Sequence, residues 1–187
     1  VVTNSRRVWS DRNYIEGNYG DVWNINTSTY EISISFNNVQ ASNLVATENA
    51  ILFFNTGGVG YANIIGNNFT DTVRRNIYLA TANQTLIANN QIVSGSPADF
   101  NIYLTGCNRI SIIGNFIKVA QTNGIKMTTS NYISVNGNIL TDNNSGFAVL
   151  ADSSNDRVAV TNNVFFNNPG GTVSNAATNA VTANNTV

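Results

Sequence analysis

Charged side chains recur at one position of a repeating pattern, and they are the residues of this chain that could perform acid–base chemistry. Glu48, Arg74 and Asp99 each stand three residues before an isoleucine that opens an apolar segment, and they are spaced 26 and 25 residues apart. If the repeats stack at the strand spacing of about 4.8 Å, the two carboxyl groups lie roughly 9–10 Å apart with Arg74 between them. Inverting glycosidases hold their acid and base about 6.5–9.5 Å apart. The spacing predicts Glu48 and Asp99 as a catalytic pair; the alternative is a surface ladder of alternating charge.

Aromatic residues occupy a second position of the same pattern. Tyr78 and Tyr103 follow the isoleucines of two successive repeats, and Lys126 and Ala148 stand in the same column further on. Exposed rings pack against the apolar face of a sugar, and tyrosine hydroxyls bond its oxygens. Together with Arg74, the Tyr78–Tyr103–Lys126 column is predicted to bind substrate. Cross-strand stabilisation of a sheet and burial in an oligomer interface are the alternatives.

A third column combines arginine with tyrosine on successive repeats. Arg109, Tyr132 and Arg157 each lie six residues before a recurring asparagine, which allows cation–π stacking worth about 0.5–1 kcal/mol at an exposed site. Such a column either holds an acidic polysaccharide or stabilises the surface. Cys107 has no histidine partner in this chain, so it is not predicted to be a nucleophile.

The composition excludes several classes of function. The 187 residues include no histidine and one cysteine. This excludes histidine-based acid–base catalysis, histidine or cysteine-cluster metal sites and internal disulfides, and no metal or other cofactor is predicted. The net charge is −1, so nothing indicates nucleic acid or an anionic membrane as partner. No apolar run reaches the length of a membrane span.

The three columns require a fold that places successive repeats side by side. The clearest repeat is an asparagine followed two residues later by an apolar residue, at intervals of 22 to 30 residues. It occurs at Asn37, Asn67, Asn90, Asn115, Asn138, Asn163 and Asn185, and Asn13 adds a further instance.

The residues around each asparagine predict strands that turn a corner. Apolar residues stand three and mostly five positions before it, with small or polar residues between them, which is the alternation of a strand with one buried face. The residue immediately before it is mostly Gly or Asn, which tolerate left-handed backbone angles. With the apolar segment of the Tyr column, each repeat carries three short strands. This predicts an all-β parallel solenoid of about seven to eight coils, with the asparagines stacked as a ladder at one corner.

Four segments carry a resemblance to a known superfamily: "ISIIGNFI", "YISVNGNIL", "VAVTNNVF" and "ANIIGNNF". They resemble the repeats of the right-handed parallel β-helix of pectin-lyase-like proteins, and most of all the β-helix domains of phage tailspikes and depolymerases. The resemblance covers the chain from Glu31 to Val187 and implies the fold more than any single activity. The Gly-His-Gly of polygalacturonases and the Asp-Pro-His-Glu of mannuronan epimerases are missing here, and no calcium-binding aspartate cluster of the pectate lyase kind is visible.

The interpretation that combines these features is a carbohydrate-engaging β-helix of a tailspike-like or secreted protein, hydrolysing a bacterial surface polysaccharide. The alternatives are a non-catalytic spacer or adhesin segment, and a polysaccharide lyase with Arg74 or Lys126 as base. Residues 1–30 are predicted as an irregular first coil and 31–187 as the repeats. A homotrimer or the remainder of a longer chain is the expected partner besides polysaccharide, and an extracellular or virion location is expected.

Overall fold

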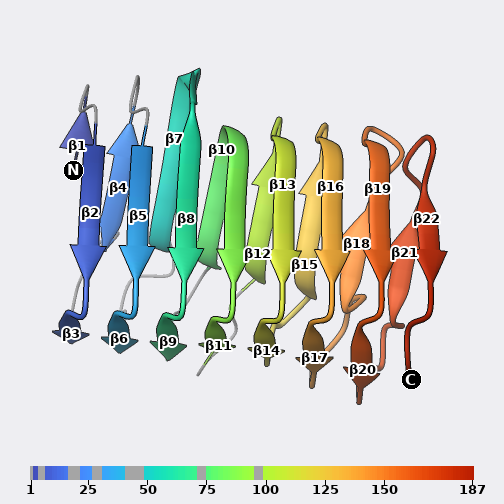
Figure 1. The fold of residues 1–187 in the computed structure, drawn as a ribbon. Helices are drawn as coiled ribbons and strands as arrows, with labels where there is room; N and C mark the ends of the chain where they lie inside the picture. Colours follow the sequence, from blue (N-terminus) through green and yellow to red (C-terminus); the bar gives the residue numbers. More distant parts are fainter. Residues whose placement is uncertain are drawn as a thin grey trace.

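The computed structural model describes residues 2–3, 7–16, 22–26, 31–40, 49–70, 75–94 and 99–187. Glu48 and Arg74 lie outside these residues. The described part contains strands and turns and no helix, so no helix in it is long and apolar enough to cross a membrane. Figure 1 shows the strands stacked in rows along one axis, from β1–β3 at one end to β20–β22 at the other.

Three parallel sheets run along this axis, because each coil contributes one strand to each of them. Sheet A contains β1 (Val2–Thr3), β4 (Trp23–Asn26), β7 (Asn49–Val59), the first half of β10 (Arg75–Ala88), β12 (Phe100–Thr105), β15 (Asn123–Thr128), β18 (Val149–Ala151) and β21 (Val173–Asn175). Sheet B contains β2 (Arg7–Asp11), β5 (Glu31–Ser35), β8 (Tyr61–Ile65), the second half of β10, β13 (Asn108–Ile113), β16 (Asn131–Asn136), β19 (Asp156–Thr161) and β22 (Val181–Ala183).

Sheet C is made of seven three-residue strands that follow the asparagine corner. They are β3 (Tyr14–Glu16), β6 (Asn38–Gln40), β9 (Asn68–Thr70), β11 (Gln91–Val93), β14 (Phe116–Lys118), β17 (Ile139–Thr141) and β20 (Val164–Phe166). The predicted right-handed parallel β-helix is confirmed. The seven stacked strands of sheet C enclose six full turns, slightly fewer than the predicted seven to eight. The number is smaller because the coils at both ends of the stack do not close among the described residues.

The strand alternation produces the core. The inward positions of sheet B are fully buried and mostly branched, which suits strands packed on one face. They include Ile34, Ile64, Ile87, Ile112, Val135 and Val160. Strands β2, β3 and β4, which precede Glu31, pair with the same sheets, and the domain boundary at residue 30 stays a prediction.

The asparagine corner is a continuous hydrogen-bonded ladder. Each corner asparagine donates from Nδ2 to Oδ1 of the asparagine one coil further on, at 2.8–3.1 Å from Asn13 to Asn185, and the six rungs between these two ends are buried. The residue before it has a left-handed backbone, with φ of 64° at both Gly114 and Gly137, and Phe36 adopts this conformation as well with φ of 54°. The corner recurs because every coil must satisfy the same buried backbone groups.

Candidate functional site

Sheet A carries the side chains that the sequence marked for substrate binding. Tyr78 on β10, Tyr103 on β12 and Lys126 on β15 are direct partners in the parallel register of three successive coils. A second column lies beside them, in which Arg75 on β10 pairs with Phe100 on β12. We call these five half-buried residues the aromatic–cation cluster.

The rings of the cluster are packed on one another. Tyr78 and Tyr103 stack with ring centroids 5.2 Å apart and planes 10° from parallel, and Phe100 tilts against Tyr103 with a centroid distance of 5.3 Å. Such pairs contribute roughly 0.5–1.5 kcal/mol beyond the burial of their area. One face of each tyrosine ring is therefore turned toward a protein ring.

Two cations lie over these rings. The guanidinium carbon of Arg75 is 4.7 Å from the Tyr78 centroid and 5.0 Å from that of Tyr103. The Lys126 ammonium is 4.8 Å from the Phe100 centroid. A cation over a ring face is attracted by the ring quadrupole. The cluster is thus a cationic patch on an aromatic base.

Sequence reasoning missed Arg75 and Phe100. The signal was present, because both stand two residues before the isoleucines that define the column, at Ile77 and Ile102. In an ideal strand that position shares the face of the buried isoleucine. The departure from strict alternation between residues 75 and 78, where two successive residues are buried, brings Arg75 to the surface beside Tyr78.

The predicted catalytic pair is represented in the described residues by one member. Asp99 is half-buried, and its backbone carbonyl accepts a hydrogen bond from the backbone N–H of Thr122 at 3.3 Å and another from the Thr122 hydroxyl. The residues that follow positions 48, 74 and 99, namely Asn49, Arg75 and Phe100, are register partners. The acid–base role of Glu48 and Asp99 stays a prediction, as does the binding role of Arg74.

The column assignment was wrong at one coil. Lys126 pairs with Leu150 of β18, and Ala148, which was expected to face outward, is buried. The apolar position of this coil is held by Val149, which pairs with Ile125, and not by Phe147, so the outward place falls two residues later than expected. A small Ala side chain fits the interior, whereas the larger Leu150 takes the outward place.

The Arg109–Tyr132–Arg157 column lies on sheet B. The Arg157 guanidinium carbon is 4.8 Å from the Tyr132 centroid and ion-pairs with the neighbouring Asp156. All three residues of the column have left-handed backbones, with φ between 52° and 59°. This conformation is uncommon for bulky residues and was not predicted for this column.

Cys107 lies in a second interior corner. It is buried, its backbone N–H donates to the Ser130 hydroxyl at 3.1 Å, and its thiol donates to the Leu79 carbonyl at 3.3 Å. Burial raises the pKa of the Cys107 thiol to about 11. The thiol is therefore protonated at neutral pH and is not a nucleophile.

These features define a parallel β-helix with a half-buried aromatic and cationic surface on one sheet. The chain belongs to the NosD family, whose model is described as periplasmic copper-binding protein (NosD) and matches residues 2–187. No curated protein matches the chain.

A solved structure with the same fold is the enzymatically active domain of tailspike protein 2 from bacteriophage CBA120. It superposes with a TM-score of 0.56 at 13% sequence identity, over 85% of this chain and 22% of that chain. This chain therefore spans about a fifth of the tailspike chain, and the similarity shows the fold.

The residues of this chain do not fit a copper site. Copper in proteins is held by imidazole, thiolate and thioether ligands, and the chain has no histidine, one cysteine and one methionine. Cys107 and Met127 are both buried, and the thiol is protonated. Among the described residues there is no group of three His, Cys, Asp or Glu side chains that could hold a metal ion.

Proposed function

We propose that this β-helix binds an acidic polysaccharide along sheet A, at the aromatic–cation cluster. The observation that carries the proposal is the gathering of Arg75 and Lys126 over three rings, in a cluster that spans three successive coils, in a chain with only nine basic residues. Guanidinium and ammonium groups bind carboxylate and sulfate oxygens by charge-assisted hydrogen bonds. The tyrosine hydroxyls supply further partners for sugar oxygens.

The arrangement suits a chain rather than a single sugar. Neighbouring coils are about 4.8 Å apart, so the cluster spans roughly 10 Å along the axis and extends the contacts over more than one sugar unit. The fold shared with a phage tailspike domain supports a saccharide ligand, and the periplasmic family description supports a location outside the cytoplasm, at a cell or virion surface.

Hydrolysis of the bound chain is the second part of the proposal. Asp99 directly precedes Phe100 of the cluster, so a polysaccharide bound at the cluster also lies near the backbone of Asp99. Glu48 and Asp99 then act as the acid and base of an inverting hydrolase. A lyase would use Lys126 or Arg74 as base instead. A spacer without activity is favoured by the mutual stacking of Tyr78 and Tyr103, which stabilises the sheet without any ligand.

Assembly into a trimer is proposed from a separate surface. Phe116, Ile139 and Val164 are register partners on sheet C and are 37%, 44% and 43% exposed. A contiguous exposed apolar column marks an interface. Light scattering of the full-length protein tests this part: a monodisperse monomer at micromolar concentration contradicts it.

Binding is tested with a panel of acidic and neutral bacterial polysaccharides. The double substitution Arg75→Gln and Lys126→Gln is expected to weaken binding of the acidic members by about tenfold or more, since each charge-assisted bond contributes about 1.5–3 kcal/mol. Lys118→Gln, on sheet C and outside every candidate column, is the matched control and should bind normally. Equal binding by the double variant and the wild type refutes the site.

Cleavage is measured on the same panel as release of reducing ends. Glu48→Gln and Asp99→Asn should each lower turnover by several orders of magnitude with binding nearly intact, because proton transfer is needed only in the transition state. Normal turnover in both variants excludes the carboxylate mechanism and leaves the binding proposal standing.

A further inference from the structure

Large aromatic side chains stand exposed at the amino-terminal end of sheet B. Trp9 on β2 is 74% exposed, Tyr61 on β8 is 60% exposed, and Phe36 after β5 is 58% exposed. Most indole side chains are largely buried in folded proteins. The three exposed aromatic residues Trp9, Phe36 and Tyr61 lie on adjacent coils and form a surface that requires an explanation.

Trp9 is open toward β5 because its partner there is small, and among the described residues no strand pairs with the other side of β2. In the parallel register Trp9 pairs with Ser33, and Ser33 pairs with Asn63. Among the described residues no ring stacks on the indole from the next coil, in contrast to Tyr78 and Tyr103 on sheet A. The same column continues with Leu86 on β10, so a larger side chain is accepted at this position elsewhere in the chain.

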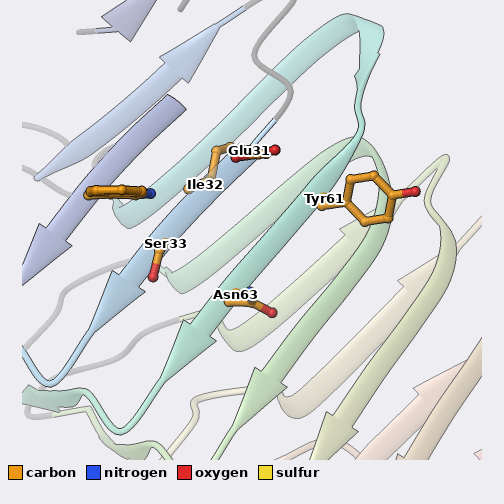
Figure 2. A pocket seen from close by; sticks show the side chains of 6 residues that line it. Glu31, Ile32, Ser33, Tyr61 and Asn63 are labelled. Atoms are coloured by element: carbon orange, nitrogen blue, oxygen red, sulfur yellow. The ribbon is translucent and has the colours of Figure 1, made fainter. Parts of the chain in front are cut away.

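Two hollows share Trp9 and Ser33. One has a volume of about 330 Å³ and is lined further by Glu31, Tyr61 and Asn63, which Figure 2 shows on the adjacent strands β5 and β8. The other has a volume of about 310 Å³ and extends past Ser35 toward Phe36. We call the two together the Trp9 groove. Each lies at the lower limit of ligand pockets, which is about 300 Å³.

The charges at the Trp9 groove are compensated. The guanidinium Nε of Arg7 lies 2.6 Å from Glu31, and the Arg12 guanidinium lies 3.6 Å from Asp11. The remaining polar groups that line the groove are neutral hydroxyls and an amide, and Ser33 and Ser35 share a hydrogen bond of 3.0 Å. A surface of an open indole with neutral donors and acceptors does not select for an anion.

We infer that the Trp9 groove is a second saccharide site, and that it binds the neutral sugar units of a polysaccharide. The apolar face of a pyranose packs on the indole, and its hydroxyls bond to Tyr61, Asn63 and the serine hydroxyls. The hollows on the two sides of Trp9 receive neighbouring units of the same chain. This site lies on a different sheet from the aromatic–cation cluster and does not depend on it.

The two tryptophans provide a direct measurement. Trp23 is half-buried against the core, so Trp23→Phe leaves Trp9 as the sole indole and as a reporter of the groove. We titrate this variant with short oligosaccharides of glucose, galactose, mannose and N-acetylglucosamine. At least one series is expected to shift Trp9 emission to shorter wavelength and to reduce its quenching by acrylamide.

Two substitutions test the contact itself by calorimetry. Trp9→Ala should weaken binding of the responding oligosaccharide by about tenfold or more. Ser33→Leu keeps the indole and covers its face, as Leu86 would, and should weaken binding similarly. Tyr132→Ala removes another exposed aromatic residue of sheet B, 50% exposed, and should leave affinity unchanged.

The inference is wrong if no neutral series changes the Trp9 emission, or if Trp9→Ala binds the sugar with normal affinity. It is also wrong if the emission shift depends on protein concentration rather than on sugar, because the groove would then be a protein interface. The Arg75→Gln, Lys126→Gln variant should keep this neutral binding, and Trp9→Ala should keep binding to acidic polysaccharide. The two proposals therefore fail independently.

Discussion

The corner asparagines and the aromatic–cation cluster are both columns of side chains stacked along the same axis. They differ in how strongly their surroundings restrict the residue type at each position. The corner asparagines from Asn37 to Asn163 are buried and bond to backbone groups of their own and the preceding coil, as Asn115 does, so the residue type recurs on every coil. The cluster faces outward, where each coil carries a different residue, such as Tyr103, Lys126 and Leu150. Interior columns therefore report the fold, and exterior columns are available for function.

The largest expected effect comes from breaking the interior ladder in its middle. Asn115 accepts hydrogen bonds from the backbone and side chain of Asn90 at 2.9 Å and donates to the Ile87 carbonyl at 2.9 Å. Asn115→Ala leaves these buried groups without partners, at about 1–3 kcal/mol each. We expect the free energy of unfolding to fall by about 3–6 kcal/mol in urea denaturation.

Asn185→Ala is the matched control for that experiment. Asn185 is the last rung, is half-buried and accepts only from Asn163, at 3.0 and 3.1 Å. Because water can reach this end of the ladder, the loss should be about 1–2 kcal/mol. Equal losses at the two positions would contradict the view that burial, rather than the asparagine itself, sets the effect.

The interior corner at Cys107 should show its burial as a pH dependence. The pKa of its thiol is raised by burial from 9.0 to about 11, so the folded state disfavours the thiolate. The stabilisation of the folded state by the protonated thiol is fully present below pH 9. It is lost as the pH rises to 11, at about 1.4 kcal/mol per pH unit. The free energy of unfolding should therefore fall more steeply with pH in the wild type than in Cys107→Ser. If the two plots of unfolding free energy against pH are parallel, burial of the thiol does not have this effect.

Exterior contacts should contribute less. Tyr78 and Tyr103 stack at 5.2 Å between centroids, and a double-mutant cycle with Tyr78→Ala and Tyr103→Ala should yield a coupling free energy of about 0.5–1.5 kcal/mol. A coupling near that of the interior rungs would remove the distinction between the two kinds of column. No coupling would show that the rings are held by other contacts.

The smallest effect is expected at the Arg157–Tyr132 contact. The guanidinium carbon lies 4.8 Å from the ring centroid at an exposed site, where a cation–π pair contributes about 0.5–1 kcal/mol. Arg157→Gln also removes the surface ion pair with Asp156, which contributes about 0–1 kcal/mol, so the free energy of unfolding should fall by no more than the two contacts together, and salt should reduce the difference. Arg109→Gln, which has no ring contact among the described residues, is the control and should change stability less.

The sequence predicted the corners better than the surfaces, and particular residues show why. Asn90 and Asn115 could be aligned because interior rungs must be equivalent on each coil, and the residue before each was expected to be left-handed, as Asn89 and Gly114 are. The outward column could not be aligned through Ala148, because Phe147 and Val149 are both apolar and only the pairing with Ile125 selects Val149. Glu48 and Arg74 lie outside the described residues, so their roles stay predictions.

The sequence by itself determined that this protein is a parallel β-helix of three strands per coil. It could do so because stacked coils impose one local condition, a buried asparagine at each left-handed corner, and a local condition is visible as a repeat. Only the tertiary structure placed Arg75 over Tyr78 and Tyr103, and only it left Trp9 uncovered beside Ser33. Those surfaces depend on which outward side chains meet between coils, and that is decided by register and by side-chain size on neighbouring strands rather than by any repeated residue.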